Sequence, residues 1–309
     1  MRLRSLVISA LTMGLAAGGC SIHPLPQDVT GSDTYEIVQK FRCEVRSAVL
    51  IRLTRGIIRY EGEERARDIF QGIGNGRIKW ADIRKHLKSR FLLDAIDRYS
   101  GSTILYDFSL TMAEKNIMSG GPTLTRPFTR GSDTIGISLS TDNERQNLRT
   151  FTIRDSFEKV IIDLEQDCPQ APPPQNFDYP IAGSTRIEET IKTFLDLNES
   201  GNLSIKAGIE TPTLSDELLF TTKKGATINP GFTYTPIGRI FEISALAGKF
   251  DVNREDIHKV TLVLALPKPG SKPTPPTIAE TLLAAEQRLA LSKQSSVDLS
   301  LQRIGDRLR

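Results

Sequence analysis

The hydrophobic positions of residues 33–49 recur with the spacing of an amphipathic helix. Asp33, followed three residues later by Glu36, has the pattern of a capping box at the start of such a helix. We therefore expect a helix of about five turns here. Cys43 lies off the apolar stripe, so a second element must cover it if it is to form a disulfide. The stripe consists of Ile37, Val38, Phe41, Val45, Ala48 and Val49.

A second amphipathic pattern covers residues 80–99 and predicts another helix. The glycine-rich stretch 72–76 precedes it. Phosphate-binding loops follow a buried strand and open a helix, whereas a charged, helix-like stretch precedes these glycines. We therefore interpret them as a turn that joins two helices. The inward positions of the predicted helix are Trp80, Ile83, Leu87, Phe91, Ala95, Ile96 and Tyr99.

From residue 103 the hydrophobic period changes from 3.6 to 2. Residues 104–112 alternate, 120–122 (Gly-Gly-Pro) are typical of a turn, 135–139 alternate again, and 148–153 form a fourth apolar segment. This pattern predicts four antiparallel strands with one apolar and one solvent-exposed face.

A helix is expected after the fourth strand. Asp155 and Glu158 have the spacing of a cap, and an apolar stripe runs from Phe157 toward Cys168. Prolines then recur over residues 169–183, which predicts an extended, semi-rigid linker.

The pattern of a helix followed by strands returns after this linker. Thr185 and Glu188 are expected to cap a helix that ends at Gly201, and a second series of strands follows. Residues 267–276 are proline-rich again, and residues 277–309 predict a C-terminal helix with a polar tail. The inward residues of the capped helix are Ile187, Ile191, Phe194 and Leu195.

Two segments of the second series resemble two of the first, in the same order. Residues 121–127 match 231–236 at an offset of 110, and residues 142–153 match 251–262 at an offset of 109. The extra Arg126 accounts for the difference. Chance similarity between two amphipathic sheets is the alternative explanation.

The prediction is therefore an α+β fold with two repeated modules, residues 33–168 and 184–266. Each is a helix plus a four-stranded antiparallel sheet, with an extra helical segment in the first and a C-terminal helix after the second.

The repeat also suggests equivalent side chains. Asp142 with Arg145, and Asp251 with Arg254, would form ion pairs across the turn before each last strand, with a ligand site as the alternative. His258 takes the place of Arg149 and is expected on the solvent-exposed face.

The N-terminus has the layout of a cleavable export signal. Arg2 and Arg4 precede an apolar run too short to span a bilayer, and small residues lead to Cys20. The sequence Ala17-Gly18-Gly19-Cys20 resembles the lipobox of bacterial lipoproteins, although the family pattern has Leu where this chain has Ala17.

The resemblance implies cleavage of residues 1–19, a lipid-modified Cys20 and a tether over 20–32. Because Ser21 follows rather than Asp, it implies the periplasmic face of the outer membrane. Inner-membrane anchoring is one alternative, and a free periplasmic protein with an incidental Cys20 is another. The partner implied is the lipid bilayer.

Composition then narrows the classes of partner. The chain has 40 Lys and Arg against 37 Asp and Glu, and loss of Arg2 and Arg4 would leave 38. A nearly neutral mature protein gives no electrostatic case for nucleic-acid binding. With Cys20 set aside, Cys43 and Cys168 make a pair in an oxidising compartment, and we expect a disulfide between them.

Basic residues gather around the only Trp of the chain. A solvated helix face over a core Trp is the simpler interpretation, and contact with anionic headgroups or a partner is the alternative. This predicted interaction patch consists of Arg77, Lys79, Trp80, Arg84, Lys85, Lys88 and Arg90.

No catalytic pattern stands out in the sequence. His23 lies in the tether, and His86 and His258 are expected on polar faces, which leaves no base for a nucleophilic triad. His-Glu-x-x-His, Gly-x-Ser-x-Gly, Cys-x-x-Cys and P-loop motifs are missing from the sequence, and we expect no metal or cofactor.

The sequence favours a membrane-anchored envelope lipoprotein whose periplasmic body binds or scaffolds another envelope protein or polymer. A periplasmic hydrolase of envelope polymers is one alternative. An accessory subunit of a secretion or transport assembly, docked through the C-terminal helix, is another.

Overall fold

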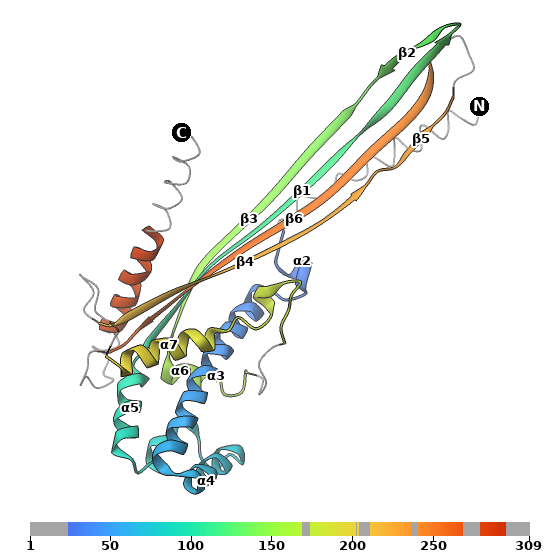
Figure 1. The fold of residues 1–309 in the computed structure, drawn as a ribbon. Helices are drawn as coiled ribbons and strands as arrows, with labels where there is room; N and C mark the ends of the chain where they lie inside the picture. The colour runs from blue at the N-terminus through green and yellow to red at the C-terminus, as the bar shows by residue number, and fades with distance from the viewer. Residues whose placement is uncertain are drawn as a thin grey trace.

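The structure is a computed structural model in which a helical body carries a long, narrow sheet that extends away from it (Figure 1). The predicted signal, Cys20 and His23 lie outside the described residues. Those residues are 24–168, 174–201, 203, 211–235, 240–267 and 279–294.

The body contains most of the helices. They are α2 (Gln27–Thr30), α3 (Thr34–Glu61), α4 (Glu63–Gly74), η1 (Trp80–His86), α5 (Arg90–Ser100), α6 (Phe157–Ile162), η2 (Pro180–Ala182), α7 (Ile187–Glu199) and a helix over residues 279–294. The strands are β1 (Thr103–Phe128), β2 (Gly131–Gly136), β3 (Leu139–Ser156), β4 (Thr213–Ile228), β5 (Gly231–Thr233) and β6 (Glu242–Ala265). The expected α+β class is confirmed.

The capping box at the start of α3 is confirmed, but the helix is 28 residues long rather than about five turns. The Asp33 carboxylate accepts from the Glu36 amide, and the Glu36 carboxylate accepts from the Asp33 amide. The helix continues because its second half has its own apolar partners: Ile57 is fully buried in a small core with residues of α4, η1 and α5.

The single helix expected over 80–99 is wrong, because the chain breaks between η1 and α5. The Glu61 carboxylate accepts from the amides of Lys88 and Ser89 at 2.7 Å, and the Ser89 hydroxyl caps α5 by accepting from the Leu92 amide. The break also turns Phe91 outward, where it is 60% exposed. The glycines at 72–76 do join two helical segments, as expected.

Two other expected caps are also wrong. Ser156, not Asp155, caps α6 by accepting from the Lys159 amide. At α7 the Thr185 side chain and amide both donate to the Glu44 carboxylate, so Arg186 takes the cap position. In both cases a tertiary contact takes the side chain that was expected to cap the helix: Asp155 pairs with Arg42, and Thr185 donates to Glu44.

The expectation of two separate four-stranded sheets is corrected: all strands lie in one antiparallel sheet. β1 and β6 pair at its centre, β2 and β3 follow one another along the outer side of β1, and β4 and β5 along the outer side of β6. Alternation of apolar residues determines which face a strand buries but not which strand lies beside it.

The expected turn at residues 120–122 is also wrong, since β1 passes straight through it. The glycines serve close strand packing instead. A β-carbon on Gly120 would lie 2.7 Å from the Ala247 carbonyl oxygen, and one on Gly121 would lie 1.8 Å from that of Ile137.

The two hairpins of the sheet pair in equivalent registers. Thr103 of β1 faces Ser156 of β3, and Thr213 of β4 faces Ala265 of β6. We call β1 and β4, which lead away from the body, the outgoing strands, and β3 and β6 the returning strands. Equivalent positions differ by 110 in the outgoing strands and by 109 in the returning strands, the offsets found in the sequence.

The main core lies on one face of the sheet base, under α3, α6 and α7, and contains residues from both predicted modules. The modules are therefore not separate folding cores. Part of the expected 169–183 linker is buried in this core: Tyr179 and Ile181 are each 1% exposed. On the other face, Leu105 and Val263 pack against the helix over residues 279–294.

Candidate functional site

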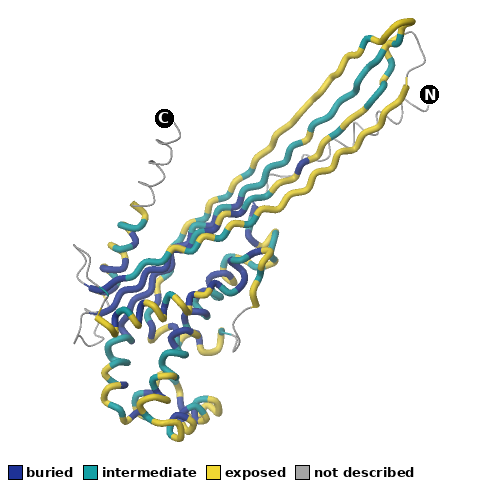
Figure 2. Tube along the Cα trace, in the orientation of Figure 1, coloured by how far each residue is buried: buried dark blue, intermediate teal, exposed yellow. Residues whose placement is uncertain are grey.

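The sheet continues far beyond the helices that cover its base. Burial of β1 ends at Met112, and exposure rises from there toward the far end (Figure 2). We call residues 113–146, 223–235 and 240–255 the distal arm. Residues 113 and 223 both pair with residue 255, so the two hairpins leave the body at the same level.

The arm has one apolar and one polar face. Residues paired across antiparallel strands share a face, as do residues two apart on one strand. Met118 of β1 faces Phe250 of β6, and Ile228 of β4 faces the same Phe250, so all three lie on one side. This apolar face contains exposed Met118, Phe128, Ile135, Ile137, Leu139, Ile228, Phe232, Ile243, Leu246, Phe250 and Val252.

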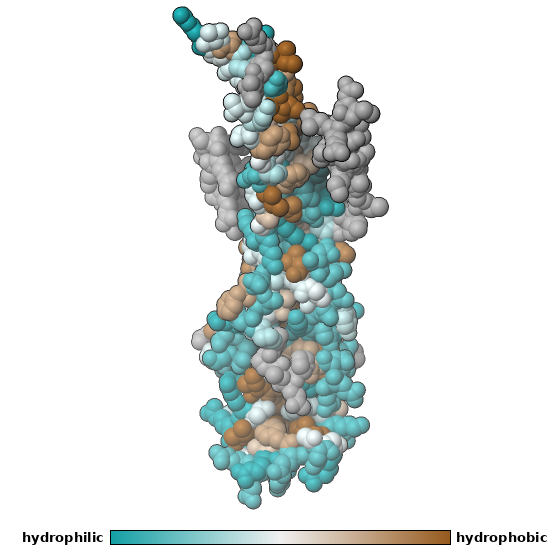
Figure 3. All heavy atoms as spheres, turned by 90° about the vertical axis from the view of Figure 1, so that its right-hand side faces the viewer, coloured by the Kyte–Doolittle hydropathy of each residue, from teal (hydrophilic) through white to brown (hydrophobic). Residues whose placement is uncertain are grey.

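The opposite face is rich in charged and hydroxyl side chains. Lys115 bridges to Asp142 at 2.8 Å and Lys249 to Asp251 at 2.5 Å. The apolar face is the one that continues from the main core, because even-numbered β1 residues lie on both. Figure 3 shows apolar side chains, in brown, at intervals along the upper part of the molecule, which is the arm.

Both long edges of the arm are open. Within the described ranges, no strand pairs with the outer side of β3 or of β4. Each edge therefore presents a row of backbone N–H and C=O groups to which another strand can hydrogen-bond.

A buried polar cluster lies where the arm meets the body, and it corrects the expectation for His258. That residue is 1% exposed rather than on a solvent-exposed face. The Tyr179 hydroxyl donates to Asp256 at 3.0 Å and contacts Nε2 of His258 closely. With the hydroxyl proton directed at Asp256, Nε2 of His258 donates and Nδ1 has no partner among the described atoms.

Burial, and secondarily Arg254, lower the pKa of His258 to about 4, against the opposing effect of Asp256. The pKa of Tyr179 is raised by burial and by Asp256. The histidine is therefore neutral at pH 7.

Arg254 connects this cluster to the start of the described chain. Its Nε donates to Asp256 at 2.9 Å, and its Nη2 donates to the Leu25 carbonyl at 2.6 Å. Asp28 lies 3.6 Å from its Nη1. The described part of the expected tether is thus held against the root of the arm, and it contains the short helix α2.

The expected ion pairs Asp142–Arg145 and Asp251–Arg254 are wrong. All four residues lie within strands rather than at a turn, and each contacts another residue. Arg145 donates to Glu114 at 2.8 Å across β1 and β3.

The predicted interaction patch does not form one helix face. Trp80, Arg84 and Lys85 lie on η1, and Lys85 is paired with Asp82 at 2.6 Å. The other basic residues lie in the segments before and after η1 or at the start of α5. The residues that are exposed are Arg77, Lys79, Lys85, Lys88 and Arg90.

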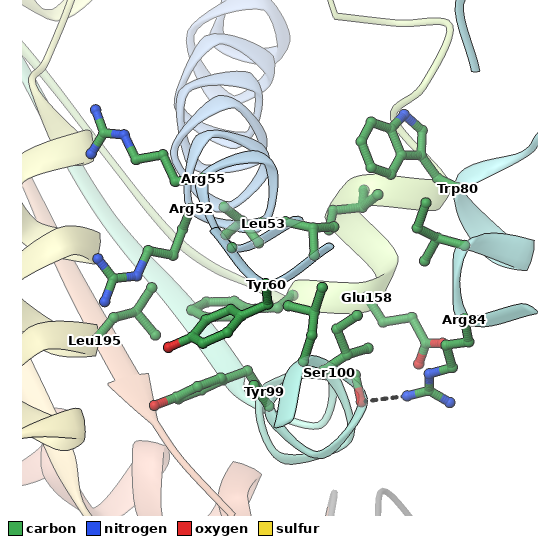
Figure 4. Close-up of a pocket in the computed structure, with 18 of the residues that line it drawn as sticks. Arg52, Leu53, Arg55, Tyr60, Trp80, Arg84, Tyr99, Ser100, Glu158 and Leu195 are labelled. Carbon is green, nitrogen blue, oxygen red and sulfur yellow. Dashed lines mark hydrogen bonds between the residues drawn. The ribbon is translucent and has the colours of Figure 1, made fainter. Parts of the chain in front are cut away.

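Trp80 and Arg84 instead line a cavity of about 250 Å³ between α3, η1, α5 and α6 (Figure 4). Most of its lining residues are apolar or aromatic, and charged residues, arginines above all, complete the wall. Arg84 pairs with Asp97 at 2.8 Å, and Arg52 with Glu199 at 2.5 Å, so these two guanidinium groups are already neutralised.

A disulfide joins Cys43 of α3 to Cys168, with Cα atoms 5.4 Å apart. It ties the first long helix to the segment after α6. In the part of the chain that the structure describes, no helix is long and apolar enough to cross a membrane. The same residues contain no group of His, Cys, Asp and Glu that could hold a metal ion.

Sequence reasoning missed the arm as a site, although its signal was present. The alternation of apolar residues continues on both sides of 120–122, and a glycine pair followed by proline masked the continuity.

Comparison with solved structures gives only weak similarity. The secretin InvG of the Salmonella SPI-1 type III secretion injectisome, residues 176 to the end in the open gate state, aligns with 66% of this chain and 69% of its own at 10% identity and a TM-score of 0.20. A second InvG structure gives a TM-score of 0.16 at 8% identity, over 67% of this chain and 74% of its own. TM-scores this low do not indicate a shared fold.

Sequence comparison is more informative. The family described as "Uncharacterised protein y4kA" matches residues 66–284. A protein of Sinorhizobium fredii (strain NBRC 101917 / NGR234) with the name "Uncharacterized protein y4kA" is 31% identical over 261 residues, which cover 82% of this chain and 80% of that protein. The family match begins within α4, includes the arm and ends in the helix over residues 279–294, and the chain belongs to the Y4kA family.

Proposed function

We propose that this protein is a bacterial envelope lipoprotein, anchored through an acylated Cys20 to the periplasmic face of the outer membrane, whose distal arm binds other envelope components and builds an assembly. The anchor is inferred from the sequence of residues 1–20. The binding element is inferred from the arm.

The observation that carries the proposal is the apolar face of the arm. Contiguous apolar surface on a soluble protein commonly marks a site of interaction with a protein or membrane. Here at least eleven large apolar side chains share one face, and they come from β1, β2, β3, β4, β5 and β6. Packing among the described residues does not explain them, because the helices in that part of the chain cover only the base.

A subunit of a secretion or transport assembly is the form of this proposal that the arm favours. In strands of 16 to 26 residues, alternate side chains lie on the same face along the whole length, with the large exposed apolar ones toward the far end. Among the described residues neither outer edge pairs with a strand, so both edges are available for strand addition. Such an element suits repeated contacts between elongated partners.

We also infer that the β1–β3 and β4–β6 hairpins are two copies of one repeated unit. Their equal pairing registers, under the offsets seen in the sequence, support this inference. The helices before each hairpin differ in number and length, so the repeat is proposed for the hairpins alone.

The arm can be tested with substitutions on its two faces. Ile135→Asn with Ile228→Asn places polar groups on the apolar face, and Thr134→Asn with Thr227→Asn changes the adjacent residues on the polar face. Complexes extracted from membranes in mild detergent are then separated by native electrophoresis. We expect the first pair to leave the high-mass fraction and the second to stay in it. Retention of the first pair would contradict the proposal.

The anchor is tested separately by labelling cells with a fatty-acid probe. The wild-type chain should incorporate the probe, whereas Cys20→Ser should not and should leave the membrane fraction. An unlabelled wild type would remove the anchor from the proposal and leave the arm unaffected.

A further inference from the structure

We propose that the partner of the arm is a second copy of this chain, whose β3 adds to the open edge of β4 in the register that β6 uses with β1. This inference rests on the proposed function, since it names the partner of the same arm.

The first step is the order of strands in the sheet. The order β3-β1-β6-β4 contains two hairpins side by side, each with its returning strand on the same side of its outgoing strand. A shift by two strands therefore superimposes β3 on β6 and β1 on β4. At the centre of the sheet an outgoing strand, β1, pairs with a returning strand, β6. The two edges are an outgoing strand, β4, and a returning strand, β3, so β4 of one copy and β3 of another can pair in the same way.

The second step is the register at that centre. Thr103 of β1 faces Ala265 of β6, and Phe108 faces Val260. The equivalent of a β1 residue in β4 has a number 110 higher, and the equivalent of a β6 residue in β3 has a number 109 lower. The pair Thr103–Ala265 therefore becomes Thr213 opposite Ser156 of the second copy. The pair Phe108–Val260 likewise becomes Leu218 opposite Phe151 of that copy.

The third step is the chemistry of the edges. Leu218 and Phe151 are half-buried, and both pack against the main core from opposite edges of the sheet. In the proposed register they would cover one another, as Phe108 and Val260 do at the centre. The register also keeps the apolar face on one side of the joined sheets, because paired residues share a face.

The contact is head to tail, since β3 of one copy meets β4 of the next and leaves one edge of each kind open. Interfaces of this type continue until a ring closes, or form an open array. The assembly would then have one apolar face across all its copies.

The register is tested by disulfide formation between full-length copies in detergent. Leu219 of one copy should lie opposite Thr150 of the next, and both residues are exposed in the monomer. Directly paired residues have Cα atoms within the range that a disulfide spans, whereas the diagonal distance is larger. A mixture of Leu219→Cys and Thr150→Cys chains should form cross-linked dimers, and a chain with both substitutions should form a ladder of multimers.

The matched control replaces Thr150→Cys by Leu148→Cys, which lies on the same face two residues along β3. It should cross-link at least several-fold less with Leu219→Cys. Equal yields, or a dominant Leu219–Leu219 product between two β4 edges, would overturn the proposed register.

Substitutions of two adjacent lysines give an independent test, because they should change the strength of association in opposite directions. The register puts Lys224 opposite Arg145 of the second copy, and puts Lys223 diagonal to Glu144, as Lys115 is to Asp142 within the chain. Lys224→Glu should therefore strengthen association about threefold or more, and Lys223→Glu should weaken it. Sedimentation of the full chain measures both, and changes of equal sign would contradict the register.

Failure of this inference can be told from failure of the proposed function. If the cross-links are missing but the Ile135 and Ile228 substitutions still release the protein from its complexes, the arm binds a different partner and the second copy is excluded. If those substitutions have no effect and no cross-link forms, both proposals are wrong.

Discussion

The guanidinium group of Arg42 and the carboxylate of Asp155 form two hydrogen bonds, of 2.7 and 2.8 Å, that join the first third of α3 to the end of β3. The Asp155 side chain is 4% exposed, and the hydrogen bond to it raises the pKa of Arg42. The pair fixes the helical body to the root of the sheet.

Asp155→Asn should lower the free energy of unfolding by about 2–3 kcal/mol, because it leaves a half-buried guanidinium without its counter-ion. Arg42→Lys should also destabilise, since an ammonium cannot replace the two-point contact. Urea unfolding measures both. Asp82→Asn, which breaks the exposed pair with Lys85, is the control and should change little.

Loss of the Cys43–Cys168 disulfide should destabilise the body. The bridge spans 125 positions, for which the chain-entropy model gives up to about 5 kcal/mol. Thiol titration in denaturant, in a Cys20→Ser background, should find no free thiol before reduction and two after it. Two free thiols before reduction would show that the bridge does not form. Urea unfolding with and without reductant gives the energetic effect.

Stability should fall as the pH drops from about 6.5 toward 4 because of His258. Its pKa is about 4 in the folded protein and about 6.5 in the unfolded chain, so the unfolded state binds more protons in this window. At pH 5 the loss relative to pH 7 should be about 2 kcal/mol. Well below pH 4, where both states are fully protonated, the residue contributes no further change.

The matched comparison for this prediction is His258→Gln. Other titrating groups contribute to both proteins, so the difference between their pH profiles isolates the histidine. Parallel profiles for the wild type and the variant would mean that His258 titrates at its ordinary pKa when folded.

Gly121→Ala should open the arm locally, because its β-carbon would overlap the Ile137 carbonyl oxygen. The Ile137 amide donates to the Pro122 carbonyl at 3.0 Å, and we expect this bond to break. Hydrogen exchange of residues 131–147 should increase. Gly136→Ala, where a β-carbon would meet nothing within 4 Å, should leave the exchange rates unchanged.

Local sequence patterns predicted where helices and strands form better than they predicted which elements lie next to one another. The capping box of α3 depends on residues three apart, and the inward face of α7 on a period of 3.6, so both could be read from the sequence. The break before α5 could not, because Glu61, the residue that stabilises it, is 27 positions from Lys88.

The sheet shows the same limit. Alternation correctly placed apolar residues of β1 on one face, but it did not show that β1 pairs with β6. The repeat aligned His258 with Arg149, yet both lie on the face that continues the core. Burial of His258 comes from Tyr179, which the proline-rich segment brings over the sheet. The sequence therefore contained the alternation of the arm, but the pairing of its strands could be seen only in the structure.

The central pairing of the sheet also sets the order in which the protein can fold. Thr103 of β1 pairs with Ala265 of β6, more than half the length of the chain away, whereas its other partner Ser156 is much nearer. When the chain becomes available from the N-terminus onward, the β1–β3 hairpin can form first, and the inner edge of β1 stays unpaired until β6 follows. Pairings this distant in sequence fold slowly. A nascent chain that stops before residue 242 would present two open edges on one hairpin, the form most prone to aggregate.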